Sequence, residues 1–368
     1  MTTNRIWLFV VLPLFLIAGG VWYAIFNISS ETYSASQTPA SVLMKQNPEY
    51  AAAEKFRKEG KHDLALASYQ KALDAAEDDF QRAQIALDIA RAMEQLGRYE
   101  EAVIRFKAIT ADTSNYAITR ATALSSVGLM YYTYSGAPLQ AIVTETFKDS
   151  PYSSFRNDGT SLGMAYIKLF EHAASIYPLA LSEVFIAYGY SNELLGMQNA
   201  TSTPQGKEYI ARVIQGLRAA DADLARMGSA VEERPLIPEA LARAGSTVDA
   251  LVTLGVVSNP EQAGAYFRDS VQYAALLGDK PGNSYALRYA SSLANRYGDA
   301  RAEDIRSLLA PFRSGNERNI HAVTTDYLRF VRAEGASSAK VGQLTALGKI
   351  DSGFKSYLLS LGWRPTDF

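Results

Sequence analysis

The stretch "YAAAEKFRKEGKHDLALASYQKALDAAED", residues 50–78, decides the fold, because small and aromatic residues recur in it at helical spacing. Ala52, Ala53 and Phe56 share one face of a first predicted helix. Gly60 follows as a glycine that ends a helix. The residues that share a face of the next predicted helix are Ala65, Tyr69, Ala72 and Leu73. The stretch therefore predicts two closely packed helices that form a hairpin.

Two further copies of this layout follow, each with apolar residues on both sides of a glycine. Gly60, Gly97 and Gly136 are spaced by 37 and 39 residues. In the second copy Ile89, Ala90 and Met93 precede Gly97, and Ala102 and Phe106 follow it; in the third, Val127, Gly128 and Tyr131 precede Gly136, and Ala141 follows it. Repeated helix pairs bury each other's faces when they stack, so the pattern predicts an α-solenoid.

Residues 50–148 resemble the tetratricopeptide repeat (TPR), whose pattern places Leu-Gly and Tyr in a first helix and Ala, Phe or Tyr, and Ala in a second. The segments "GKHDLALASYQKAL" and "GRYEEAVIRFKAI" carry the resemblance most clearly. The resemblance implies a superhelix whose concave face is lined by the first helix of each pair. It also implies a protein partner, bound as a peptide or a helix in the concave groove.

The resemblance further implies which residues meet this partner. They are Tyr50, Glu54, Arg57 and Lys58 in the first repeat, Gln84, Arg91, Glu94 and Gln95 in the second, and Leu129, Tyr132 and Thr133 in the third. Arg57, Lys58 and Arg91 could clamp a carboxylate of the partner. The alternative is that these three are ordinary solubilising charges.

The hairpin pattern returns in residues 236–368, where Gly255 and Gly298 are 43 residues apart and Trp363 is expected to pack in a C-terminal cap. Between the blocks, residues 149–235 are an aromatic-rich helical segment. No segment alternates Val, Ile or Thr with polar residues over a strand length. We therefore expect an all-α chain, with TPR-like repeats over residues 49–148 and looser hairpins after residue 236.

The N-terminal residues 6–26, "IWLFVVLPLFLIAGGVWYAIF", contain no charge and are long enough to cross a bilayer as a helix. We expect a single transmembrane anchor there, after a short cytoplasmic stretch (1–5) and before a flexible linker (27–48). A cleaved signal peptide is the alternative. Arg5 before the span favours a chain whose remaining residues lie outside the cytoplasm, in a cytoplasmic or inner membrane, although the same scaffold could face the cytoplasm.

Nothing in the sequence predicts catalysis, a cofactor or a metal site. The chain has no cysteine, and its three histidines, His62, His172 and His321, are far apart. HExxH, phosphate-binding and G-x-S-x-G motifs are absent. The net charge of −2 without a basic cluster argues against nucleic-acid binding. We therefore expect a protein that is not an enzyme.

The aromatic-rich segment leaves one alternative open. It contains Tyr152, Phe155, Tyr166, Phe170, Tyr177, Phe185, Tyr188 and Tyr190. If exposed, these side chains could form a partner hot spot or a platform for glycans. If buried, they fill the core. The favoured function is a membrane-anchored scaffold for a protein partner in envelope assembly, secretion or a chaperone-like role. The alternative is an envelope glycan-binding protein or enzyme.

Overall fold

The computed structural model describes residues 39–133, 137–151, 162–227, 237–276, 284–313, 338–364, 366 and 368. Every regular element in these ranges is a helix, which confirms the all-α expectation. In chain order the elements are α3 (Pro39–Gln46), α4 (Pro48–Lys58), α5 (His62–Asp74), α6 (Asp79–Gln95), α7 (Tyr99–Ala111), α8 (Ala117–Thr133), α9 (Ala137–Phe147), α10 (Leu162–Ile176), α11 (Ala180–Gly196), α12 (Pro204–Met227), α13 (Ile237–Thr253), α14 (Glu261–Leu276), α15 (Ser284–Tyr297), the 3₁₀ helix η4 (Gly298–Arg301), α16 (Ala302–Arg313), α18 (Ser338–Ile350) and α19 (Ser352–Ser360).

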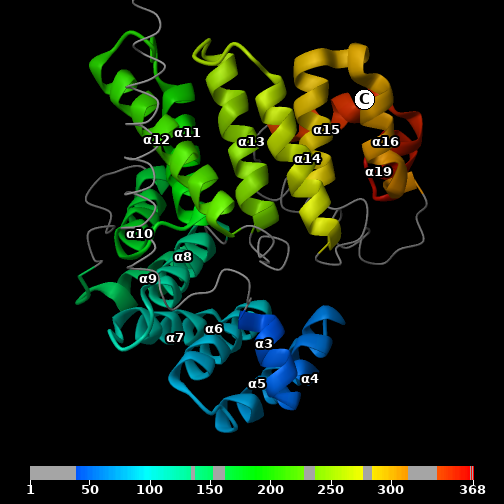
Figure 1. Ribbon diagram of the computed structural model, residues 1–368. Helices are drawn as coiled ribbons and strands as arrows, with labels where there is room; N and C mark the ends of the chain where they lie inside the picture. Colours follow the sequence, from blue (N-terminus) through cyan, green and yellow to red (C-terminus); the bar gives the residue numbers. More distant parts are fainter. Residues whose placement is uncertain are drawn as a thin grey trace, which may run out of the picture.

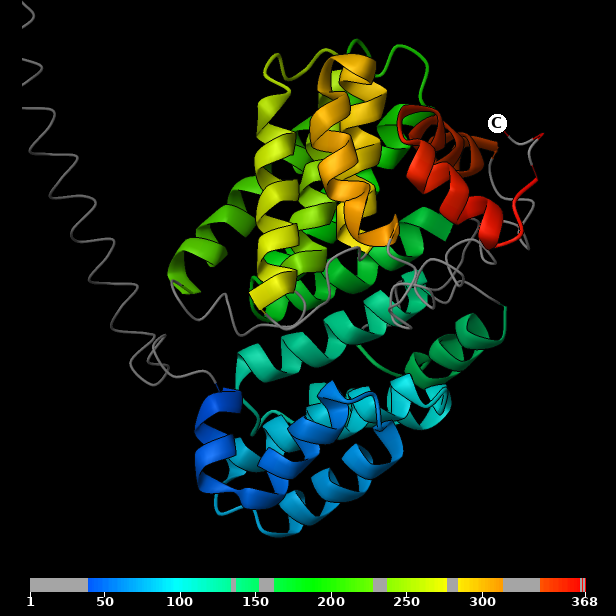
Figure 2. The same ribbon diagram turned by 90° about the vertical axis from the view of Figure 1, so that its right-hand side faces the viewer.

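Most helices pack side by side with the next helix along the chain, while α8 packs mainly against α10 and α11 packs against both α12 and α13, an arrangement consistent with a helical repeat solenoid. In both views α3–α7 lie at one end of the molecule, α11–α19 at the other, and α8–α10 between them (Figures 1 and 2). Helix α8 packs against α7 and α10, and α11 packs against α12 and α13. One hydrophobic core runs from Leu43 in α3 to Trp363 after α19. The described helices therefore form one body.

Short polar side chains start several of these helices. The Oδ1 of Asn47 accepts a hydrogen bond from the backbone N–H of Tyr50 at 3.1 Å and caps α4. Asp78 caps α6 in the same way through the N–H of Gln81, at 2.7 Å. Such caps satisfy backbone donors that have no partner within the helix. They place α4 and α6, the first helices of two successive hairpins, at defined starting residues.

Glycine ends the first helix of three hairpins, as the sequence predicts for Gly60, Gly97 and Gly255, whereas the predicted turn at Gly136 lies outside the described residues. Gly60, Gly97 and Gly255 have φ values of +71°, +73° and +72°. At each, the glycine N–H and the next residue's N–H bond back to carbonyls of the last turn; for Gly97 these are the carbonyls of Glu94 and Met93, at 2.9 Å each. This pair of backbone hydrogen bonds is the Schellman motif. The left-handed conformation explains why glycine occupies these turns.

Small residues inside the first helices let the paired helices approach closely. A Cβ added to Gly128 in α8 would lie 3.1 Å from ring atoms of Phe170 in α10. A Cβ added to Gly245 in α13 would lie 2.9 Å from the ring of Phe267 in α14. Both phenylalanines are fully or almost fully buried. The pairing of a small residue with an aromatic one thus sets the distance between helices.

The expected transmembrane helix, and with it the expected location as a single-pass membrane protein, needs correction. Among the described residues, no helix combines the length and the apolar composition needed to cross a bilayer. The longest of them, α12, has 24 residues but carries charged side chains such as Lys207, Arg212 and Asp221 along its length. The segment predicted as the anchor, residues 6–26, lies outside the described residues.

Part of the expected linker, residues 27–48, is helical. Helix α3 packs against α4 and α6, and its Leu43 is 1% exposed. Burial of one leucine side chain favours this packing by about 2 kcal/mol. Residues 39–46 are therefore part of the repeat body.

Candidate partner-binding surface

The residues expected to bind a partner lie on α4, α6 and α8, the predicted first helices of three successive hairpins. Of these, α8 packs mainly against α10 rather than against α9. Helix α4 carries Tyr50, Glu54, Arg57 and Lys58; α6 carries Gln84, Arg91, Glu94 and Gln95; and α8 carries Leu129, Tyr132 and Thr133. Lys58 and Gln95 are exposed, whereas Tyr50 and Glu54 are buried. The structure therefore divides the set into surface residues and members of an internal polar network.

Asp88, which the sequence analysis did not single out, organises one half of this network. Its side chain accepts hydrogen bonds from Tyr50 at 2.8 Å and from Gln84 at 3.3 Å. It also pairs with Arg91 at 3.0 Å. Burial raises the pKa of Asp88, and the Arg91 guanidinium opposes that rise. The contact between Tyr50 and Asp88 joins α4 to α6 and so links two neighbouring hairpins.

Glu54 organises the other half. Arg57 donates to its two oxygens, at 3.1 and 2.8 Å, in a forked pair. The hydroxyl of Tyr69 in α5 donates to the same carboxylate. Burial raises the pKa of Glu54, but the hydrogen bonds and charge of Arg57 outweigh burial and hold the pKa below its usual range. We call Tyr50, Glu54, Arg57, Tyr69, Gln84, Asp88 and Arg91 the N-terminal network.

Two of the three cations expected to clamp a ligand carboxylate already bind carboxylates of their own chain. Arg57 holds Glu54 and Arg91 holds Asp88, whereas Lys58 is exposed. The charges of these two arginines are therefore balanced within the network. A clamp formed by Arg57, Lys58 and Arg91 stays a prediction, and a ligand would have to compete with Glu54 and Asp88 for the two guanidiniums.

Tyr132 lies in a second group of side chains. Its hydroxyl accepts a hydrogen bond from Arg243 at 3.0 Å, across 111 residues of sequence. The Arg243 guanidinium lies 4.9 Å from the Tyr132 ring centroid, 4.8 Å from that of Tyr188 and 5.7 Å from that of Phe185. Each distance is within the range of a cation–π contact. The group therefore encloses one guanidinium with three rings from α8 and α11.

Glu239 balances part of this charge. Arg243 donates to its Oε1 at 2.7 Å, and Arg288 in α15 donates to both of its oxygens, at 3.0 Å each. Burial raises the pKa of Glu239, but the two arginines outweigh burial and lower the pKa to about 2. We call Tyr132, Phe185, Tyr188, Glu239, Arg243 and Arg288 the arginine–aromatic cluster. It connects α8, α11, α13 and α15.

Tyr132, Phe185 and Tyr188 were candidates from the sequence, whereas Glu239, Arg243 and Arg288 were not. The pair Glu239 and Arg243 has the i, i+4 spacing of an ion pair on a helix, which was a readable signal. Arg288 gave no such signal, because its partner Glu239 lies 49 residues away in sequence. Only the packing of α13 against α15 brings Arg288 to Glu239.

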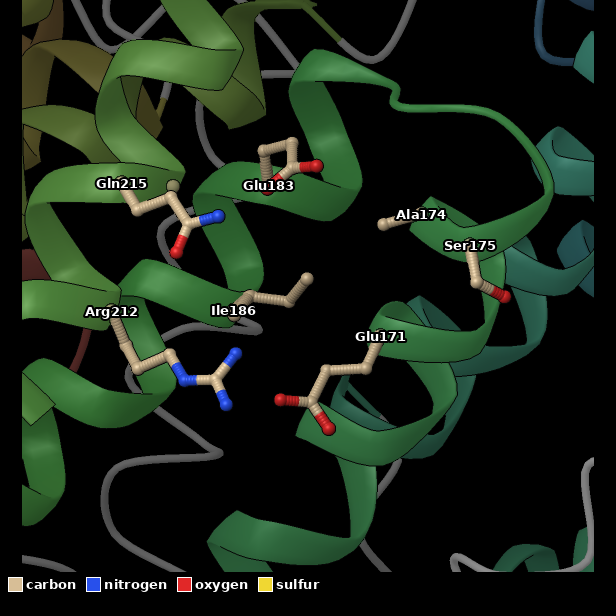
Figure 3. Close-up of a pocket in the computed structure, with 8 residues that line it drawn as sticks. Glu171, Ala174, Ser175, Glu183, Ile186, Arg212 and Gln215 are labelled. Carbon is tan, nitrogen blue, oxygen red and sulfur yellow. The ribbon is translucent and has the colours of Figure 1, made fainter. Parts of the chain in front are cut away.

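A cleft of about 340 Å³ lies among α10, α11 and α12 (Figure 3). In Figure 3 the carboxylate of Glu171 in α10 and the guanidinium of Arg212 in α12 point toward each other across it, and Glu183 lies on α11. Glu171 accepts a hydrogen bond from Tyr190 at 2.9 Å. Burial and the nearby charge of Asp223 raise the pKa of Glu183. The lining joins two carboxylates and one guanidinium but includes no aromatic ring.

Most aromatic side chains of the middle segment are core residues. Tyr166, Phe170, Phe185 and Tyr190 are buried, and Tyr177 and Tyr188 are half-buried. Phe170 and Phe185 stack with their centroids 4.7 Å apart. Tyr152 and Phe155 lie outside the described residues. In the described part of the chain these aromatics therefore form no exposed platform for a sugar.

The two described histidines lie in different helices, α5 and α10. His62 is half-buried at the start of α5, and His172 is half-buried in α10. His321 lies outside the described residues. In the part of the chain that the structure describes, no three His, Asp or Glu side chains are placed to hold a metal ion.

The comparisons with known proteins point to the same class as the geometry. Residues 47–145 match a family model described as "Tetratrico peptide repeat". The match begins at the cap of α4 and ends in α9, and it supports a TPR-like family for this part of the chain. A comparison with curated proteins gave no match. TPR repeats are typically non-catalytic and commonly bind protein partners, so the match of residues 47–145 suggests a protein-interaction scaffold.

Proposed function

We propose that this protein is a non-catalytic scaffold that holds a protein partner along the face formed by the first helices of its hairpins. The observation that carries the proposal is the repetition of one hairpin design. The same Schellman turn recurs at Gly60, Gly97 and Gly255, within and beyond the residues that match the TPR model. Stacked hairpins of this kind present a long, continuous surface that suits an extended peptide or a helix.

The exposed residues of the predicted site mark where the partner lies. Lys58 ends α4 and Gln95 ends α6, at corresponding positions in two successive repeats. Their neighbours Glu54, Asp88 and Arg91 form hydrogen bonds and ion pairs within the N-terminal network, which joins α4 to α5 and α6 beneath them. A rigid surface loses little entropy when a partner binds. The network thus has a supporting role in this proposal.

Site-specific photo-crosslinking in cells tests the proposal. The photoreactive residue p-benzoylphenylalanine replaces Lys58 or Gln95 on the first helices. In the matched controls it replaces Lys71 or Ile104, which are exposed on the second helices α5 and α7. We expect Lys58 and Gln95 variants to give the same protein adduct, identified by mass spectrometry, and the controls to lack it. Equal adducts from all four positions, or none from the first two, would refute the scaffold function.

A glycan-binding protein or enzyme is the weaker candidate. Glu171 from α10 and Glu183 from α11 both line the cleft of Figure 3. Glycan binding usually needs an aromatic surface as well, and the cleft has none. Glu171 is also held by Tyr190. For these reasons the proposal assigns the aromatic-rich segment a role in packing.

A further inference from the structure

The charges of the arginine–aromatic cluster do not balance. Among the described residues of the cluster, Glu239 is the single carboxylate and it receives both Arg243 and Arg288. The cluster thus has a formal charge of +1. The next polar pair along α13 and α15, Asp249 with Arg296, adds no net charge. Together, Glu239, Arg243, Asp249, Arg288 and Arg296 therefore carry one guanidinium in excess.

The surroundings divide the two arginines into an inner and an outer one. The Arg243 side chain is 13% exposed and is covered by the rings of Tyr132 and Tyr188. The Arg288 side chain is 31% exposed, and its guanidinium lies 5.8 Å from the ring centroid of Tyr285. Glu239 itself is 16% exposed and is already shared. Arg288 is therefore the member that can take up a further anion from outside.

The N-terminal network has no such excess. Each of its arginines, Arg57 and Arg91, has its own carboxylate, Glu54 or Asp88. An unbalanced charge that is partly withdrawn from water is unfavourable unless an opposite charge compensates it. That difference singles out the C-terminal half of the molecule as the place where an external anion improves the electrostatics.

We propose that Arg288, on the arginine–aromatic cluster, is the docking point for an acidic segment of the protein partner, through a forked bond from the guanidinium to an Asp or Glu carboxylate. This rests on the proposed scaffold function and adds the chemistry of the partner. The planar guanidinium favours a carboxylate in two-point geometry. Tyr285 and Glu239 hold the guanidinium from the protein side, so little side-chain entropy is lost on binding.

Binding of a fluorescein-labelled hexaglutamate peptide to the full chain, followed by fluorescence anisotropy, tests the proposal. We expect Arg288→Gln to weaken binding by about tenfold, the effect of losing one charge-assisted pair. The matched control is Arg301→Gln. Arg301 is 32% exposed, lies 5.5 Å from the Tyr297 ring centroid, and contacts both Glu261 and Asp304. The Arg301→Gln variant removes the same charge at nearly the same exposure, but from a group in which carboxylates balance the arginines, because Glu261 also pairs with Arg268. We expect less than about a twofold change.

Three results would overturn the docking point: no binding of hexaglutamate by the unchanged protein, equal binding by Arg288→Gln, or an equal loss in Arg301→Gln. Labelled hexalysine serves as the control peptide, and binding as tight as that of hexaglutamate would also refute the proposal. Circular dichroism checks the fold of each variant. If Arg288→Gln does not fold, Arg288→Lys keeps the charge and loses the fork, and it should bind about threefold more weakly; unchanged binding by this variant contradicts the forked contact.

The two proposals fail in different ways. If the crosslinks from Lys58 and Gln95 form but hexaglutamate does not bind, the scaffold function is supported and the docking of an acidic segment is refuted. If hexaglutamate binds through Arg288 but no crosslinks form, the anion site is supported and the scaffold function is refuted.

Discussion

The two polar groups of this molecule are built from the same residue types but differ in balance. The N-terminal network pairs two arginines with two carboxylates, and tyrosine hydroxyls donate hydrogen bonds to the same carboxylates. The arginine–aromatic cluster sets two arginines against one carboxylate and covers one of them with rings. A balanced group needs nothing from outside, whereas an unbalanced one gains from an added anion. The comparison teaches that the number of arginines alone does not locate a binding site.

The two groups also differ in the distance they bridge. The bond from Tyr50 to Asp88 joins neighbouring hairpins, 38 residues apart in sequence. The bond from Arg243 to Tyr132 joins α13 to α8 across 111 residues. The second group therefore attaches the part of the chain that matches the TPR model to the C-terminal half. Its loss should affect the whole body more than loss of the first.

The largest expected effect comes from Glu239→Gln. The change leaves two partly buried guanidiniums without a carboxylate, which should lower the free energy of unfolding by about 3 kcal/mol. The counterpart in the N-terminal network, Asp88→Asn, keeps an acceptor for Tyr50 and leaves one arginine that is 24% exposed. We expect that change to cost about 1 kcal/mol. Urea unfolding followed by circular dichroism measures both.

A double variant sharpens the same test. Glu239→Gln combined with Arg288→Gln removes the outer guanidinium as well, so part of the lost stability should return. If the two single variants, Glu239→Gln and Asp88→Asn, cost the same, the difference in balance between the groups has no energetic meaning. A double variant less stable than Glu239→Gln would contradict the excess of positive charge.

What the sequence could and could not predict follows from the distance between partners. The hairpins and their glycine turns were predictable, because a Schellman motif depends on residues within one helical turn of Gly60 or Gly97. The pairing of Arg57 with Glu54 was readable too, from its i, i+3 spacing. The resemblance to TPR repeats instead implies that both residues contact a ligand.

The remaining features of the site depend on tertiary packing. No local pattern relates Tyr132 to Arg243, and nothing in sequence shows that Glu239 is shared between two arginines. The helical content of residues 39–46 was missed because prolines and polar residues surround a short apolar group. Burial of Leu43 stabilises the helix in this segment, and this burial requires the partner helices α4 and α6 to be in place.

The next largest effect concerns pH and a carboxylate of α6. Burial raises the pKa of Glu94 from about 4.5 to about 7, against the opposing charge of Arg91. Between those values the folded state binds more protons than the unfolded one, so stability falls as pH rises. In the Glu94→Gln variant, the decrease in the free energy of unfolding between pH 5 and pH 8 should be smaller by about 2 kcal/mol. Urea unfolding at several pH values measures it.

Glu239 provides the opposite case in the other half of the molecule. Its folded-state pKa of about 2 is lower than the usual value, so it stabilises the fold above about pH 4. That stabilisation is lost as pH falls toward 2. Glu94→Gln should leave this acidic loss unchanged. If Glu94→Gln and the unchanged protein show the same slope above pH 5, Glu94 does not bind the extra proton in the folded state.

The smallest expected effect tests the feature that the two halves share. Gly97 and Gly255 have nearly equal positive φ values, and a Cβ added to either has no other atom within 4 Å. Alanine at either position therefore meets only the strain of the left-handed backbone, about 1 kcal/mol. Asparagine, which tolerates this conformation better, should cost less at both. A difference between Gly97→Ala and Gly255→Ala of more than about 0.5 kcal/mol would show that the two halves, alike in their turns, differ in local stability as well as in charge.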